Sequence, residues 1–265
     1  MTAEPAPVVQ LSGVRLERGG RAVLRDIDLA VPRGSITAVL GPSGSGKSTL
    51  LAALTGELEP AAGTVELFGK PVPRNRRALL EARKQLGVLL QGNGLLTDLT
   101  AGENIALPLR AHTTLPEPVL RRLVLLKLHA VGLRGAVDLF PRELSGGMAR
   151  RVALARALAL DPPLMIYDEP LTGLDPIASG VIMDLVHRLN RTLGLTSIIV
   201  THHVHETLPI ADRAIVIADG RIAYSGTPDG LQASGDPLLR QFLEGRADGP
   251  IAFDMGAGAA RTEAA

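Results

Sequence analysis

One glycine-rich stretch, Gly41–Thr49 (GPSGSGKST), carries the clearest chemistry in the chain. It follows the apolar run Ser35–Leu40 and precedes the apolar run Leu50–Leu54, so we expect a strand, a turn and a helix in that order. The spacing G-x-x-x-x-G-K-[ST] is that of a phosphate-binding loop. In such a loop the backbone amides and the helix N-terminus hold phosphate oxygens, Lys47 would reach the β- and γ-phosphates, and Ser48 would bind Mg²⁺.

The alternative for this stretch is a Gly/Ser-rich loop that matches the spacing by chance, and the strand before it and the helix after it argue against that. We therefore predict that the loop binds the phosphates of a nucleotide. The predicted contacts are Gly41, Pro42, Ser43, Gly44, Ser45, Gly46, Lys47, Ser48 and Thr49.

A pair of acids, Asp168 and Glu169, ends the apolar run Leu164–Tyr167. At the carboxyl edge of a parallel sheet this pair would face the phosphate-binding loop. Asp168 would hold Mg²⁺, directly or through water, and Glu169 would act as the general base toward an attacking water. Two acids in the turn after a strand are common without such a role, so the assignment depends on the glycine-rich loop.

Ser145, Gly146 and Gly147 open a predicted helix and form a second candidate anion site. A plain serine N-cap followed by flexible glycines is the alternative. Because one nucleotide needs only one phosphate-binding loop, a second anion site about a hundred residues away suggests that a partner subunit uses it.

The elements that must position these groups follow from the pattern of apolar residues. Strands and helices alternate, so we expect an α/β fold with a mainly parallel sheet covered on both faces. From about residue 99 to 160 the pattern is helical throughout, which indicates an inserted helical subdomain. Strands are predicted at 8–17, 23–31, 35–40, 63–68, 86–90, 164–167, 196–200, 213–218 and 221–224, and helices at 47–56, 74–84, from 100, 116–131, 145–160, 177–193 and 236–244.

The composition narrows the class of protein. A chain of 265 residues with 46% hydrophobic and 21% charged residues is globular rather than disordered. A net charge of +1 and 2% aromatic residues argue against a nucleic-acid partner. The chain has no Cys, no uncharged apolar run of membrane-spanning length and no signal-peptide layout at its start. We expect it in the cytosol or, through a partner, at the cytosolic face of a membrane.

Taken in order along the chain, the motifs resemble those of the ATP-binding cassette (ABC) ATPases, and the resemblance covers nearly the whole chain. The signature differs at Met148, where glutamine is usual. The matching segments are Gly41–Thr49 (Walker A), Gln91 (Q-loop), Ser145–Met148 (signature), Met165–Glu169 (Walker B), Gly173–Pro176 (D-loop) and His202 (switch histidine).

The resemblance implies the P-loop NTPase fold of ABC ATPases, with a mainly parallel sheet core, an N-terminal antiparallel β subdomain and an inserted helical subdomain. The expected division of this single domain is a catalytic core at 1–98 and 161–235, a helical subdomain at 99–160 and a C-terminal extension at 236–265.

The family resemblance also implies a head-to-tail homodimer, in which ATP and Mg²⁺ lie between Walker A of one subunit and Ser145–Gly147 of the other. Gln91 would contact Mg²⁺ and the water, and Asp175 would line the dimer interface. His202 would contact the γ-phosphate and hold Glu169 and the water in place, although alone it would be taken for a surface histidine. No Cys and no cluster of acidic residues lies beside His203 and His205 in the sequence, so we expect no metal site there.

Arg18 stands where the family usually has an aromatic ring against the adenine. A guanidinium can stack on a purine, and a solvated arginine in a turn is the alternative. Met148 removes an amide near the ribose but leaves the two glycine N–H groups unchanged.

Four further segments resemble the ATPase subunits of Mla-type phospholipid transporters: 87–100, 107–112, 144–151 and 236–250. Such ATPases work with an integral membrane permease, an MCE-domain lipid-binding protein and often a STAS-domain subunit. The resemblance therefore implies a peripheral protein on the cytoplasmic face of the inner membrane, which touches the membrane only through the permease. The alternatives are an ABC ATPase that serves polar solutes or metals, or a non-transport ABC protein; the latter usually has two cassettes or a long coiled coil.

Overall fold

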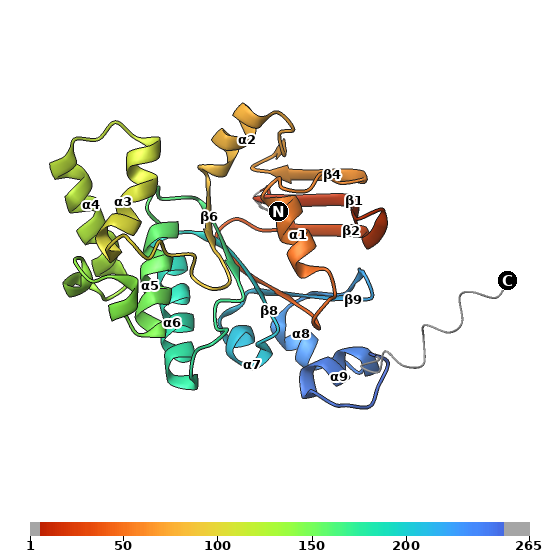
Figure 1. Ribbon diagram of the computed structural model, residues 1–265. Helices are drawn as coiled ribbons and strands as arrows, with labels where there is room; N and C mark the ends of the chain where they lie inside the picture. The colour runs from red at the N-terminus through yellow and green to blue at the C-terminus, as the bar shows by residue number, and fades with distance from the viewer. Residues whose placement is uncertain (1–5, 252–265) are drawn as a thin grey trace, which may run out of the picture.

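A six-stranded sheet forms the centre of the protein, of which the computed structural model describes residues 6–251 (Figure 1). Its strand order is β10-β9-β3-β8-β7-β6. The neighbours from β9 to β6 are parallel, and only β10 runs antiparallel to β9. The strands are β3 (Ile36–Leu40), β6 (Leu86–Leu89), β7 (Leu164–Asp168), β8 (Thr196–Thr201), β9 (Arg213–Ala218) and β10 (Arg221–Gly226).

Strands β3 and β8 are continuous apolar or small-residue runs because both faces of the parallel sheet are covered. Every residue of β3 and of β8 is buried. Because β3, β7 and β8 are parallel, the segments that follow their carboxyl ends lie at one edge of the sheet. That edge receives the phosphate-binding loop, the acid pair and His202.

A second, antiparallel sheet has the order β2-β1-β4-β5. Its inward residues alternate with exposed ones, as in β2, because one face packs on the core and the other meets solvent. The strands are β1 (Val9–Arg18), β2 (Arg21–Val31), β4 (Ala62–Leu67) and β5 (Lys70–Pro71).

Helices α3, α4 and α5 pack together on the side of the molecule away from the antiparallel sheet (Figure 1). Thr100 and Glu103 form a capping box that starts α3. The buried residues of these helices share one apolar cluster with Met165 and Tyr167 of β7, so this helical group is anchored on the central sheet. The helices are α1 (Lys47–Leu54), α2 (Arg76–Arg83), α3 (Ala101–His112), α4 (Glu117–Ala130), α5 (Gly146–Ala157), α6 (Pro176–Leu193), α7 (Val204–Thr207), α8 (Pro228–Gln232) and α9 (Pro237–Glu244), with short 3₁₀ turns at Arg134–Ala136, Pro141–Glu143 and Leu208–Ile210.

The predicted α/β class, the mainly parallel sheet and the antiparallel sheet are confirmed, and each predicted strand and helix has a counterpart. The pattern missed three short elements: β5, α7 and α8. The predicted extension at 236–265 is described only as far as Ile251, where α9 is followed by a turn, and the rest lies outside the described residues. Over 6–251 no helix combines the length and apolar character needed to cross a membrane.

Candidate functional site

The phosphate-binding loop joins β3 to α1, as the sequence predicts. At two positions of the loop only glycine fits, because a Cβ would clash with neighbouring atoms. A Cβ on Gly41 would lie 2.3 Å from the Ile217 carbonyl oxygen, and one on Gly46 would lie 2.6 Å from Leu24 Cδ2, where φ is also +105°. Gly46 precedes α1 without a side-chain cap, so the first N–H groups of the helix keep their donors for an anion.

Lys47 lies folded against this loop. Its Nζ donates to the carbonyl oxygens of Gly41 (2.7 Å) and Pro42 (2.9 Å). Burial lowers the pKa of Lys47, while the nearby carboxylates of Glu169 and Asp168 act in the opposite direction. A buried ammonium held by two neutral carbonyls would gain from an anionic partner, which is the role expected of a lysine that binds phosphate.

Ser45 supplies a second sign that the loop fits an anion. The residue is 8% exposed, and its Oγ has no hydrogen-bond partner within residues 6–251. A buried hydroxyl without a partner is costly, and a phosphate oxygen in the loop would satisfy it. The residues present therefore fit the phosphates of a nucleotide.

The acid pair ends β7 at the same edge of the sheet. Burial, followed by the neighbouring Glu169, raises the pKa of Asp168, and Lys47 partly offsets this. Glu169 has a left-handed backbone (φ 46°), and its N–H donates to the Val200 carbonyl oxygen at 2.8 Å. This bend in the chain turns the Glu169 carboxylate toward the end of β8.

The Glu169 carboxylate is held by two side chains from the end of β8. Its Oε2 accepts a hydrogen bond from Thr201 Oγ1 at 2.9 Å, and its Oε1 lies 3.0 Å from His202 Nδ1. The Glu169 side chain is 13% exposed and that of His202 is 49% exposed. The predicted pairing of Glu169 with His202 is therefore present in the geometry, with a carboxylate fixed in position but reachable by water.

These groups line one pocket of about 350 Å³. It joins the phosphate-binding loop to Gln91 after β6, to the acid pair after β7 and to His202 after β8. Ser48, Gln91 and Asp168, the predicted Mg²⁺ ligands, all line it and offer the oxygen donors that Mg²⁺ prefers. The lining residues are Val23, Ser43, Gly44, Gly46, Lys47, Ser48, Thr49, Gln91, Asp168, Glu169, Thr172, Val200 and His202.

Eight predicted site residues are not among those that line this pocket: Arg18, the loop residues Gly41, Pro42 and Ser45, and Ser145, Gly146, Gly147 and Asp175. Ser145 caps α5 by accepting from the Met148 N–H at 3.3 Å. Asp175 caps α6 by accepting from Ile177 and Ala178 N–H, each at 2.9 Å. A Cβ built on Gly147 would lie 3.6 Å from Ala178 Cβ, so the two helix starts are neighbours and form a surface apart from the phosphate-binding loop.

Arg18 lies beside α1, outside the 350 Å³ pocket. Its Nε donates to Thr49 Oγ1 at 3.2 Å, and the residue is exposed. The contact ties the antiparallel sheet to the helix that follows the phosphate-binding loop. Contact between Arg18 and an adenine stays a prediction.

Three residues that hold this site were missed by the sequence reasoning: Thr201, Arg150 and Arg156. Thr201 is fully buried and also accepts from the His203 N–H at 3.0 Å. Its only signal in the sequence is a polar residue that ends a buried strand just before His202.

Arg150 and Arg156 project from α5 and hold the segment around Gln91 by its backbone. Arg150, 3% exposed, donates to the carbonyl oxygens of Leu90 (3.2 Å) and Thr172 (3.0 Å). Arg156 donates to the carbonyl oxygens of Gly94 (2.6 Å) and Asn93 (3.1 Å). Burial lowers the pKa of both arginines. The helix that begins with Ser145 is thus fastened to the loop that contains Gln91.

Known proteins are similar to this chain in sequence and in fold. Residues 24–172 match the family described as "ABC transporter". The "Intermembrane phospholipid transport system ATP-binding protein MlaF" of Haemophilus influenzae is 49% identical over 247 residues, which is 93% of this chain and 94% of that protein.

Solved structures agree with the sequence match. The cbiO1 protein of Clostridium perfringens, part of the ABC transporter complex cbiONQ, has a TM-score of 0.82 at 29% identity and covers 90% of this chain and 95% of its own. The ATP-binding cassette MJ0796, in a dimeric post-hydrolysis state with ADP and Pi, has a TM-score of 0.75 at 30% identity over 83% of this chain and 98% of its own. The chain belongs to the ABC transporter family and is one of its ATPases.

Proposed function

We propose that this ATPase is the subunit that powers phospholipid transport between bacterial membranes through a separate membrane permease. The observation that carries the proposal is the near full-length similarity to MlaF of Haemophilus influenzae, the ATP-binding protein of an intermembrane phospholipid transport system. The segments 87–100 and 236–250, which resemble those of Mla-type ATPases, support the same assignment.

The geometry supports a direct role for Glu169 in hydrolysis. The carboxylate of Glu169, which Thr201 and His202 fix from two sides, would accept a proton from a water in the pocket as the water oxygen attacks the γ-phosphorus. The bond between that phosphorus and the bridging oxygen breaks, and ADP leaves with that oxygen. Lys47 and the uncapped start of α1 hold the phosphate charge. Mg²⁺, when bound by Ser48, Asp168 and Gln91, would neutralise charge on the β- and γ-phosphates.

The separation of Ser145, Gly146 and Gly147 from the phosphate-binding loop supports a composite site. One chain supplies the loop, the acids and His202, and a second copy supplies its uncovered α5 start in a head-to-tail homodimer, with Asp175 at the interface. The solved MJ0796 cassette is dimeric, which supports the same arrangement.

A groove of about 470 Å³ supports a binding place for the permease, and it is lined in part by Arg156, which bonds the backbone of the 92–99 loop. It runs between α2, β6, α3 and α5 and has apolar residues such as Leu80 and Leu107, which are 47% and 42% exposed. We propose that a cytosolic helix of the permease binds here and that the helical subdomain (99–160) moves it when the core (1–98 and 161–235) closes on ATP.

The remaining parts of the assembly follow from the same assignment. An MCE-domain lipid-binding protein and a STAS-domain subunit would complete the complex, and the segment 236–250 would serve as a partner contact. The ATPase would then lie on the cytoplasmic face of the inner membrane and touch lipid only through the permease.

Reconstitution tests the assignment. The chain is assembled with its membrane subunits in vesicles, and transfer of a fluorescent phospholipid is followed with and without ATP. Transfer should require ATP and should stop with Glu169→Gln. If the chain instead assembles with a system for polar solutes or metals and moves no phospholipid, the transport assignment is wrong while the ATPase assignment stands.

A further inference from the structure

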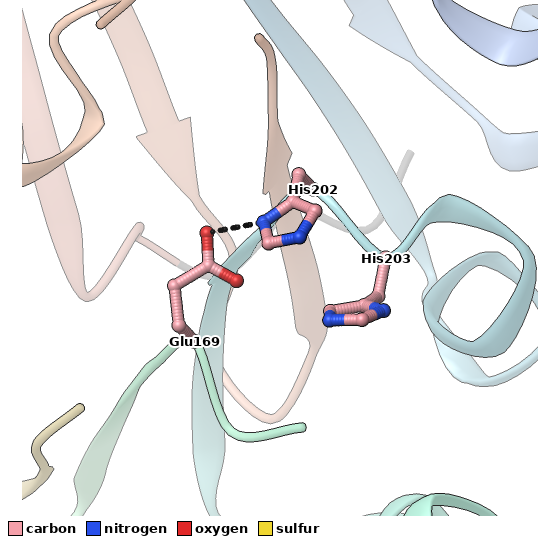
Figure 2. Close-up of side chains that lie close together, drawn as sticks. All are labelled: Glu169, His202 and His203. Atoms are coloured by element: carbon pink, nitrogen blue, oxygen red, sulfur yellow. Dashed lines mark hydrogen bonds and ion pairs between the residues drawn. The ribbon is translucent and has the colours of Figure 1, made fainter. Parts of the chain in front are cut away.

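Glu169, His202 and His203 form a cluster with the donor atoms of a metal site (Figure 2). One ligand atom from each lies within 4.8 Å of the others. The sequence sets no acid next to His203, but β7 and β8 are parallel neighbours, and their ends bring Glu169 to the two histidines from 33 residues away. We propose that this cluster binds a transition-metal cation of the Zn²⁺ class and that the bound metal blocks ATP hydrolysis.

The geometry is close to that of a three-ligand zinc site. Zn–N and Zn–O bonds of about 2.0–2.2 Å in a tetrahedron separate neighbouring donors by roughly 3.4 Å. Glu169 Oε1 and His202 Nδ1 are 3.0 Å apart, and the two imidazole rings have centroids 4.4 Å apart with planes tilted by 32°. His202 lies between the other two side chains (Figure 2), and binding of one ion would require the side chains to rotate so that the three donors face it.

The surrounding contacts already orient one of the ligands, the Glu169 carboxylate, and fix the backbone of His203. Thr201 Oγ1 donates to Glu169 Oε2 and accepts from the His203 backbone N–H. Such outer contacts fix the direction of metal ligands and raise affinity. His202 is half exposed, so a metal has an entry path and a water can take the fourth position.

The donor set separates this site from the Mg²⁺ site. Two imidazole nitrogens and one carboxylate oxygen suit Zn²⁺, Co²⁺, Ni²⁺ or Cu²⁺, whereas Mg²⁺ prefers oxygen ligands in an octahedron. The predicted Mg²⁺ ligands are oxygen donors on Ser48, Gln91 and Asp168. Glu169 and His202 line the same pocket as these residues, so the two sites are neighbours with different donor sets.

Metal at this cluster would disable the proposed hydrolytic step. The ligating nitrogens of His202 and His203 and the Glu169 oxygen each donate a lone pair, so any proton on those atoms leaves to solvent. Glu169 then has a metal bond where it would accept the proton of water, and His202 is drawn away from the γ-phosphate. The phosphate-binding loop is untouched, so ATP still binds. The inhibitory half of this inference rests on the proposed role of Glu169.

Metal binding is tested first without nucleotide or turnover, so this result does not depend on the role of Glu169. The full-length protein is titrated with Co²⁺ alone, and visible absorption of four-coordinate Co²⁺ is followed before displacement by Zn²⁺. The wild type should give this absorption. His203→Ala and His203→Asn should weaken Co²⁺ binding at least ~10-fold, the usual scale for disturbing a metal shell.

His205→Ala is the matched control, because His205 is an exposed histidine of α7 outside the cluster, and it should bind Co²⁺ as the wild type does. Thermal unfolding in chelator shows that each variant is folded. With Mg²⁺ and ATP in excess, Zn²⁺ should lower the hydrolysis rate of the wild type and of His205→Ala at least ~10-fold, relative to the rate of each protein without Zn²⁺. The rate of His203→Ala should fall much less. Absorption of octahedral Co²⁺ only, or equal Co²⁺ binding by wild type and folded His203 variants, would overturn the site.

Discussion

Thr201→Val is the sharpest test of how the active site is held. Thr201 is fully buried at the end of β8, and its hydroxyl donates to Glu169 Oε2 at 2.9 Å. Valine has nearly the same shape and is equally favoured in a strand, so the substitution removes the hydroxyl with little change in packing. Thr201→Ser keeps the hydroxyl and is the matched control.

The expected loss of kcat in Thr201→Val follows from the hydrogen bond between Thr201 and Glu169. A hydrogen bond to a charged acceptor has a net value of about 1.5–3 kcal/mol, which is a factor of roughly 10 to 150 in rate if all of it positions the carboxylate. His202 still contacts the other carboxylate oxygen at 3.0 Å, so we expect a loss near the lower end, about 10-fold in kcat. The His203 N–H that also bonds Thr201 is near solvent and can turn to water.

The assay measures kcat and KM for ATP hydrolysis together with the equilibrium affinity for ATP. Thr201 does not line the nucleotide pocket, so Thr201→Val should lower kcat and leave ATP affinity within about twofold, an order-of-magnitude bound for an indirect contact. Thr201→Ser should retain most of the rate. A normal kcat for Thr201→Val, or an equal loss in Thr201→Ser, would refute the view that this hydroxyl positions Glu169.

Three other substitutions test the remaining parts of the site. Glu169→Gln should still bind ATP but turn over at least ~10²-fold more slowly, and near-normal turnover would remove Glu169 as general base. Arg150→Met should leave the carbonyl oxygens of Leu90 and Thr172 without their donor, so the unfolding midpoint and kcat should both fall. Arg150→Lys should recover only part of this loss, because an ammonium cannot reach both carbonyls as a guanidinium does. Ser45→Ala should weaken ATP binding about 10-fold without loss of stability, because its Oγ has no partner in the part of the chain that the structure describes, and unchanged affinity would contradict a phosphate contact.

Local spacing was enough to predict the phosphate-binding loop and the element on each side of it. Lys47 bonds the carbonyl oxygens of Gly41 and Pro42 in the same turn, so its place depends on neighbours in the sequence. The steric need for Gly41 and Gly46 comes from the distant residues Ile217 and Leu24, and the motif spacing indicated the glycines without that reason. The acid pair was predictable for the same reason, since a buried strand ends directly before it.

Contacts between distant segments could not be read in this way. Thr201 reaches Glu169, and Arg150 reaches Leu90 and Thr172, only because the sheet order and the packing of α5 bring these segments together. The cluster of Glu169, His202 and His203 could not be predicted for the same reason, because its acid follows β7 and is brought to the histidines only by the pairing of β7 with β8.

Short elements were missed because they have no periodic pattern. Helix α7 has 4 residues and α8 has 5, too few for a repeat of apolar positions. Thr227, which caps α8 by accepting from Gly230 N–H at 3.1 Å, and Pro228 after it were an available start signal. Strand β5 exists only as a two-residue pairing at the edge of β4.

Mixing two inactive variants tests the composite site most directly. Ser145→Arg should block the signature surface, Lys47→Ala should disable the phosphate-binding loop, and each homodimer should hydrolyse almost no ATP. A mixed dimer of the two has one intact site, so equal mixing with free exchange should restore up to about a quarter of the wild-type rate. Recovery on mixing is the result we predict. If the variants demonstrably exchange subunits and no activity returns, the site is not shared between two copies of this chain.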